Sequence, residues 1–211
     1  MSKIVELVTA WAEFDQQYPN QSVEQFCQYQ LAQQKATEAE SNYDRQQQIG
    51  GLLKILGRIT SAFALYHRAA MAKTGLPTAE SFYYLNGLRY LGEVRKTELI
   101  QYLFAEYTTG MEAISRLHEE DYIVERADPA DKRAKLISLT EKGIQALSAS
   151  YQYSSKAGEM IFNGVNTEII NLCQALLAPI EERNTQEVAS LKTKDFDVMY
   201  ARLMKESTNQ P

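Results

Sequence analysis

Apolar residues recur along most of this chain at the spacing of an amphipathic helix, so the pattern predicts a mostly α-helical protein. The strongest such pattern begins after Asp44 and is sustained for about six turns. Its stripe comprises Ile49, Leu52, Leu53, Leu56, Ile59, Thr60, Phe63, Tyr66, His67 and Ala70. Gly75-Leu76-Pro77 ends this helix, and Thr78 begins the next.

Further helices are predicted on both sides of this region. One runs from Ser2 to Gln17, and a second starts where Ser22 and Gln25 form the spacing of a capping box. Thr140 with Glu141 begins a long helix that continues beyond Gly143, and Asn166 or Thr167 caps another, which Pro179 is expected to kink or end. The segment from Val188 to Met204 is predicted as one last amphipathic helix.

Between residues 96 and 143 the period of the pattern changes. Glu98–Phe104 and Tyr107–Glu120 are predicted as short helices separated by a break at Ala105-Glu106, and Asp121 ends the second of them. Tyr122–Val124 and Leu136–Leu139 are runs of β-branched and aromatic residues that predict two strands. A charged, turn-rich connection joins them. A helix-turn-helix followed by a hairpin wing is an arrangement that docks on DNA.

At these residues the chain resembles the winged-helix MarR family of bacterial transcription regulators. The resemblance rests on the wing tip Asp128-Pro129-Ala130-Asp131-Lys132-Arg133, on Leu139-Thr140-Glu141-Lys142-Gly143 after the second strand, and on Arg116-Leu117. It implies a mostly α fold: a winged helix-turn-helix with a two-stranded wing, flanked by long N- and C-terminal dimerisation helices.

The domain organisation follows from this resemblance. Residues 1–43 are interpreted as an N-terminal helical extension, 44–75 and 144–206 as the helical dimerisation region, and 76–143 as the winged helix-turn-helix DNA-binding domain. The long striped helices would expose too much apolar surface in a soluble monomer. We therefore expect a homodimer, whose two recognition helices lie about 34 Å apart and match a pseudo-palindromic operator in double-stranded DNA.

The residues expected to meet DNA lie on the second short helix and on the wing. They are Tyr107, Thr108, Thr109, Glu112, Arg116, Lys132, Arg133 and Lys135. The resemblance implies that Arg133 enters the minor groove, while Asp128 and Asp131 are structural residues of the wing. Hydroxyls and backbone N–H groups at a helix N-terminus suit phosphate oxygens.

Charge complicates this interpretation. The net charge is −5, whereas DNA binding is driven largely by Lys and Arg on phosphates. Glu112 and Glu119 fall on the outward face of the recognition helix, where a carboxylate costs affinity, although Glu can accept from cytosine N4. The alternative function is therefore a winged-helix protein-interaction or dimerisation module with weak or no DNA binding.

Other chemistry is sparse in the sequence. No nucleophile–base pair, phosphate loop or metal-ligand spacing is present, so we expect neither an enzyme nor a bound cofactor or metal. His67, Cys27 and Cys173 are interpreted as buried packing residues. No uninterrupted apolar run approaches the roughly 20 residues that span a membrane, and no signal peptide begins the chain, which favours the cytoplasm.

A small aromatic or apolar effector is a further possible partner. Four of the 13 tyrosines fall on helices that line a cleft in the family that the chain resembles. They are Tyr66, Tyr83, Tyr84 and Tyr90. Aromatic clefts suit phenolic or apolar molecules, although core packing explains the tyrosines equally well.

Overall fold

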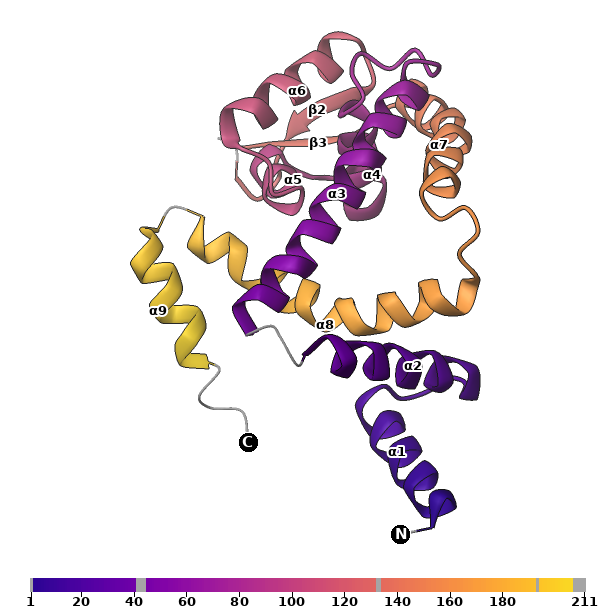
Figure 1. Cartoon of the computed structure of the whole chain (residues 1–211). Coiled ribbons are helices and arrows are strands. Elements are labelled where there is room, and N and C mark those ends of the chain that lie inside the picture. Colours follow the sequence, from indigo (N-terminus) through magenta and orange to yellow (C-terminus); the bar gives the residue numbers. More distant parts are fainter. Residues whose placement is uncertain (1, 41–44, 132–133, 193, 207–211) are drawn as a thin grey trace. The chain divides into compact units, whose positions relative to one another are not determined.

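A computed structural model of the chain describes residues 2–40, 45–131, 134–192 and 194–206. The described residues form nine helices and three short strands (Figure 1). In chain order they are α1 Lys3–Gln17, α2 Val23–Glu40, α3 Arg45–Met71, α4 Ser81–Leu91, β1 Val94–Arg95, α5 Lys96–Tyr102, α6 Tyr107–Glu119, β2 Ile123–Ala127, β3 Lys135–Leu139, α7 Glu141–Ile161, α8 Thr167–Leu191 and α9 Phe196–Glu206. The mostly helical winged-helix architecture expected from the sequence is confirmed.

Local capping sets several of these boundaries, as the sequence predicted. The backbone N–H of Gln25 donates to Ser22 Oγ at 3.2 Å, while the Ser22 N–H donates to Gln25 Oε1 at 2.6 Å. Thr140 and Asn166 cap α7 and α8 by accepting from backbone N–H groups three residues later, each at 3.0 Å. Asp121 ends α6 in the left-handed conformation, with φ at 58°.

The chain divides into two compact units. One comprises Met1–Gln48 and Gly164–Pro211, and the other comprises Ile49–Asn163. In the first unit α2 packs on α8, and an aromatic cluster forms around the buried rings of Phe14 and Phe26. This cluster gives the N-terminal helices a small core of their own.

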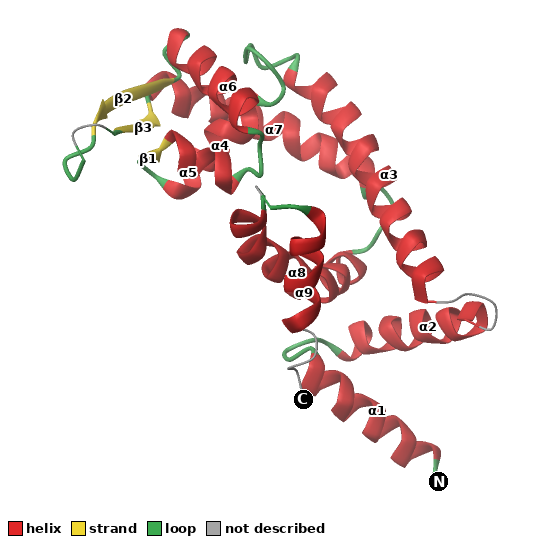
Figure 2. Cartoon of the chain, turned by 90° about the vertical axis from the view of Figure 1, so that its left-hand side faces the viewer, coloured by secondary structure: helices red, strands yellow, loops and turns green. Residues whose placement is uncertain are grey.

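The second unit contains the winged helix. Its core gathers buried side chains from α3, α4, α5, α6, α7 and the strands, including Leu85, Leu99, Ile114, Ile137 and Leu147. The strands form one antiparallel sheet in the order β1-β3-β2, drawn yellow in Figure 2. Strand β1 pairs Val94 with Ile137 and was not predicted, so a third strand joins the two of the wing.

Three expectations about the boundaries of helices and strands need correction. Helix α8 does not end at Pro179 but continues to Leu191, so of the two expected outcomes, a kink or an end, the end is excluded. The predicted last helix is interrupted: Asp195 accepts from the Asp197 N–H at 2.9 Å and starts α9 anew. Strand β2 extends through Ala127, into the predicted connection.

The two cysteines are exposed and not buried. Each directly follows a buried residue on its helix, Cys27 after Phe26 and Cys173 after Leu172. Successive residues of a helix point about 100° apart, so burial of one turns the next toward solvent. His67, in contrast, is buried as predicted.

One described helix, α3, is long and apolar enough by length and composition to cross a membrane. The mean hydropathy of its most apolar 18-residue window is 1.3, and none of that window is buried in the chain. Polar residues interrupt the apolar ones along α3, so the helix has no long uninterrupted apolar run. Only its mean hydropathy reaches the level of a membrane-spanning helix. Its exposed apolar side chains need another surface to cover them.

A close backbone approach joins the wing to α7. A Cβ atom added at Gly143 would overlap the carbonyl oxygen of Tyr122, a backbone atom that cannot swing away. We therefore expect Gly143→Ala to lower the free energy of unfolding by roughly 1–3 kcal/mol or more. Gly158 in the same helix has open space around it, so Gly158→Ala should raise stability by roughly 0.5–1 kcal/mol. Urea unfolding of both variants measures the difference, and equal effects would contradict this account of Gly143.

Candidate nucleic-acid interface

Helix α6 presents a polar outer face and buries its opposite side. Gly110, Ile114 and Leu117 are buried against the core of the winged helix. An alanine Cβ at Gly110 would lie 2.6 Å from Ile100 Cγ1, so the absence of a side chain lets α6 pack closely on α5. This contact and the two buried aliphatic residues fix which face of α6 points to solvent.

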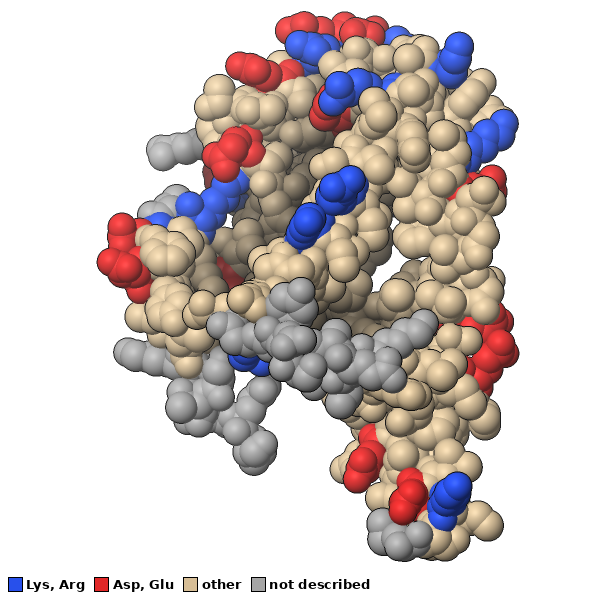
Figure 3. All heavy atoms as spheres, in the orientation of Figure 1, with Lys and Arg blue, Asp and Glu red and all other residues tan. Residues whose placement is uncertain are grey.

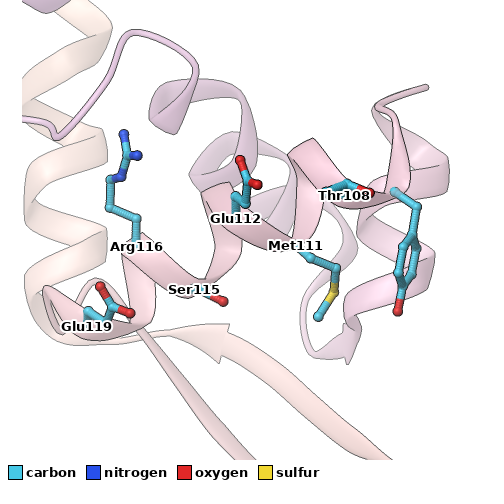
Figure 4. A pocket seen from close by; sticks show the side chains of 7 residues that line it. Thr108, Met111, Glu112, Ser115, Arg116 and Glu119 are labelled. Carbon is cyan, nitrogen blue, oxygen red and sulfur yellow. The ribbon is translucent and has the colours of Figure 1, made fainter.

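The outer face of α6 carries most of the DNA-contact residues that the sequence predicted. Figure 4 shows these side chains along a shallow hollow on the helix surface. The hollow is lined by Tyr107, Thr108, Met111, Glu112, Ser115, Arg116 and Glu119. The predicted residue Thr109 is also exposed, in the first turn. Structure therefore brings the predicted α6 residues together on one accessible surface.

The N-terminus of α6 is open to a ligand. Glu106 precedes it in an extended conformation, and its side chain makes no capping hydrogen bond. The first N–H groups of a helix have no acceptor within the helix, so those of the first turn are available to a phosphate oxygen. The turn before α6 is tight, with Phe104 at a φ of 53°.

A second hollow lies between the start of α5, the start of α6 and strand β3. Its lining residues are Arg95, Lys96, Thr97, Tyr107, Met111, Ala134 and Lys135. Three of them are cations, which makes this the part of the described winged helix where positive charge and the recognition helix meet. Of the three, only Lys135 was expected from the sequence.

Ion pairs hold the wing against α5. The Arg95 guanidinium donates from Nε and Nη2 to Asp128 Oδ2 at 3.0 and 2.7 Å. Asp128 Oδ1 also accepts from the Ala130 N–H at 2.8 Å, and Asp131 Oδ2 lies 3.7 Å from Arg95 Nη2. The hydrogen bonds from Arg95 hold the pKa of the Asp128 carboxyl below its usual range. Asp128 is thus the buried anchor of the wing, with Asp131 more exposed beside it.

Acidic side chains also pair with three cations around the wing, of which the sequence predicted only Lys135 as a DNA contact. Glu125 pairs with both Lys96 and Lys135, and their hydrogen bonds lower its pKa to about 2. Arg126 pairs with Glu93. The predicted contact residues Lys132 and Arg133 lie outside the described residues. Lysine and arginine side chains around the wing therefore serve in part to hold the wing in place.

Surface charge follows the same mixed pattern. On the face shown in Figure 3, Lys and Arg side chains are interleaved with Asp and Glu, and most of the surface is uncharged. This face shows neither a continuous basic band nor a uniformly acidic surface.

Sequence reasoning missed Arg95 and Lys96. Both pair with residues about 30 positions later, so no local spacing marks them. The only available signal was the excess of acids around the wing, which need cations as partners. In the part of the chain that the structure describes, no group of three or more His, Cys, Asp or Glu side chains is placed to hold a metal ion.

Comparisons with known proteins identify the domain. Residues 83–143 match the family model of a winged helix DNA-binding domain. No curated protein matches the chain significantly. Among solved structures, MarR of Escherichia coli in complex with operator DNA is 17% identical, with a TM-score of 0.58 over 65% of this chain and 99% of that one.

Two further structures agree with this match. A MarR-family regulator of Listeria monocytogenes bound to a 26-mer DNA is 21% identical, with a TM-score of 0.60 over 68% of this chain and 95% of that one. BpsR of Bordetella bronchiseptica, whose DNA binding is regulated by 6-hydroxynicotinic acid, is 23% identical, with a TM-score of 0.51 over 64% and 98%. The chain therefore has a winged helix DNA-binding domain and the fold of these MarR-type transcription regulators.

Proposed function

We propose that the chain is a dimeric, cytoplasmic transcription regulator of the MarR type that binds a pseudo-palindromic operator in double-stranded DNA. The observation that carries the proposal is the geometry of α6, which exposes polar side chains and the uncapped N-terminal end of the helix beside the hollow lined by Arg95, Lys96 and Lys135. Two of the matched proteins have this fold and were solved with DNA bound. Their likeness supports DNA as the ligand of the same surface here.

The proposed contacts divide by chemistry. Tyr107, Thr108 and Thr109 at the start of α6 bind phosphate oxygens, and Glu112 and Arg116 face the bases. Lys132, Arg133 and Lys135 on the wing meet the backbone and the minor groove, while Asp128 and Asp131 keep the wing in position. The contacts on phosphates position the protein, and those on base edges select the sequence.

The proposed contacts on phosphate and in the minor groove predict a specific response to Arg133→Ala. The wild-type chain should bind a DNA fragment from upstream of its own coding sequence at about 50 mM salt, with affinity falling as salt rises. Arg133→Ala should weaken binding on the order of tenfold and reduce the salt dependence by about one counterion. Gel shifts at several salt concentrations measure both.

The matched control is Lys3→Ala, which removes the same charge from α1, outside the family match. It should leave DNA binding unchanged. Absence of wild-type binding to any promoter fragment at low salt would contradict DNA binding and favour the alternative, a protein-interaction or dimerisation module.

The dimer is supported by the apolar side chains that the single chain leaves exposed. Helix α3 carries many exposed apolar side chains, among them Leu53, which is 63% exposed, and Ile55, which is 57% exposed. Apolar surface of this extent is covered by association in soluble proteins, and two-fold dimers are the commonest solution. A two-fold axis also supplies the two recognition helices that a palindromic site requires.

Sedimentation in detergent-free buffer tests this assignment. The 24.0 kDa chain should sediment as a particle of twice that mass. Leu53→Asp, which places a charge on the exposed face of α3, should shift it toward the monomer. Tyr90→Asp changes an even more exposed side chain on α4, within the predicted DNA-binding domain, and should leave the dimer intact. A wild-type chain that is monomeric at micromolar concentration, or soluble only in detergent, would refute the proposal.

A small aromatic effector is supported by the surroundings of His67. The imidazole is 2% exposed and stacks on the Tyr83 ring at 4.8 Å between centroids, with Phe63 and Phe82 also in contact. Burial lowers the pKa of His67, and its Nε2 has no hydrogen-bond partner among the described residues. A buried polar atom without a partner costs roughly 1–3 kcal/mol, so a conformation in which a bound molecule reaches Nε2 would recover that cost.

An effector that binds better to a dimer with wrongly spaced recognition helices would release DNA by population shift. Gel shifts with added 6-hydroxynicotinic acid, the molecule that regulates DNA binding by BpsR, test the proposed release of DNA by an effector. We expect release of DNA by this or a related aromatic acid, and His67→Phe should reduce the response. Unchanged DNA binding across a panel of such acids would remove the effector from the proposal.

A further inference from the structure

Glu112 and Arg116, on the outer face of α6, differ from the described charged residues of β1 and of the wing in having no partner. Among the residues that the structure describes, neither takes part in an ion pair or a side-chain hydrogen bond. Both are exposed, and in Figure 4 they project to the same side of α6. They are four positions apart, the spacing at which Glu and Arg on a helix surface commonly pair.

The acids of the wing and of the segments on either side of β1 behave differently. Glu93, Glu125 and Asp128 each hold a cation in place, and Glu98 accepts from the Arg95 N–H at 2.9 Å. These carboxylates stabilise the fold of the DNA-binding unit. Glu112 contributes to no such contact, so its place on the helix has no structural explanation within the described residues.

The position of Glu112 limits what it can meet. It is the sixth residue of a 13-residue helix and lies opposite the buried Gly110, Ile114 and Leu117. In helix-turn-helix proteins the N-terminal part of the recognition helix contacts base edges in the major groove. A carboxylate there repels phosphates, so it reduces affinity unless a base donor faces it.

Base chemistry then selects the partner. Carboxylates accept from the N4 amino group of cytosine, whereas arginine donates to O6 and N7 of guanine as a fork. Glu112 and Arg116 are separated by about 6 Å along the helix axis, close to two base steps of about 3.4 Å. One recognition helix can therefore meet a cytosine and a guanine within the same half-site.

We propose that α6 reads G·C base pairs, with Glu112 accepting from cytosine N4 and Arg116 donating to guanine within about two base steps. This assignment rests on the proposed DNA-binding function and adds the identity of the bases. It gives the acidic residue on the recognition face a role in specificity, obtained at a cost in general affinity for DNA.

Selection of binding sites from a random double-stranded DNA pool tests the assignment with the full chain and three variants. Glu112→Gln removes the charge and keeps the shape, and glutamine pairs with adenine. Arg116→Lys keeps the charge and loses the fork. Glu119→Gln is the matched control, because it removes the same charge from the last residue of α6. Thermal unfolding of each variant confirms that it is folded.

Wild-type half-sites should contain a cytosine and a guanine within two base steps. Glu112→Gln should lose the preference for that cytosine and accept adenine there. The ratio of the affinity for the cytosine site to that for the adenine site should change about fivefold or more. Arg116→Lys should lose only the guanine preference. Glu119→Gln should strengthen binding to all sequences alike.

Two results would overturn the inference in distinguishable ways. If the wild type selects a sequence but Glu112→Gln alters affinity equally for every site, the assignment of cytosine to Glu112 fails while DNA binding stands. If the wild-type chain selects no sequence at all, the proposed function fails and the base assignment with it.

Discussion

The close packing of α6 on α5 is the constraint on which the functional surface depends. Gly110 lets the two helices approach at Ile100, while Ile114 and Leu117 anchor the same side of α6 in the core. A helix held along one stripe has no freedom to rotate, so the identity of its outward residues is fixed as well. The polar face of α6 is a consequence of what is buried beneath it.

Charge in the winged helix performs two separate tasks. Arg95 and Lys96 lie at the junction of β1 and α5, where their pairing with Asp128 and Glu125 ties the wing to the helix-turn-helix. Such pairs use cations that would otherwise attract phosphate, and they help to explain how an acidic chain carries a DNA-binding fold. Among the described residues, Glu112 and Arg116 on α6 take part in no such pair, and α6 is the helix that we propose to read the bases.

The helices outside the winged helix differ from it in their many exposed apolar side chains. Their exposed apolar residues are numerous on α3, on α1 and on α9. The N-terminal helices nevertheless have a core of their own, formed by aromatic rings packed on α8. The solved structures cover 65% and 68% of the chain, so about a third of its residues lie outside those two matches.

The sequence by itself determined the elements whose causes are local. The capping box of Ser22 and Gln25, the caps at Thr140 and Asn166, and the helix end at Asp121 each involve residues at most three apart, so the chain specifies them wherever it folds. The change from helical spacing of apolar residues to short runs of β-branched residues, between residues 96 and 143, likewise predicted two short helices and a wing.

Only the tertiary structure decided the features that join distant segments. Arg95 meets Asp128 across 33 positions, and Val94 becomes a strand because β3 offers it a partner. Cys27 and Cys173 turned out exposed because their neighbours Phe26 and Leu172 filled the same small core. The sequence identified which residues of α6 face outward. Only the tertiary structure shows that Glu112 and Arg116 have no ion-pair partner among the described residues, whereas the acids around the wing do.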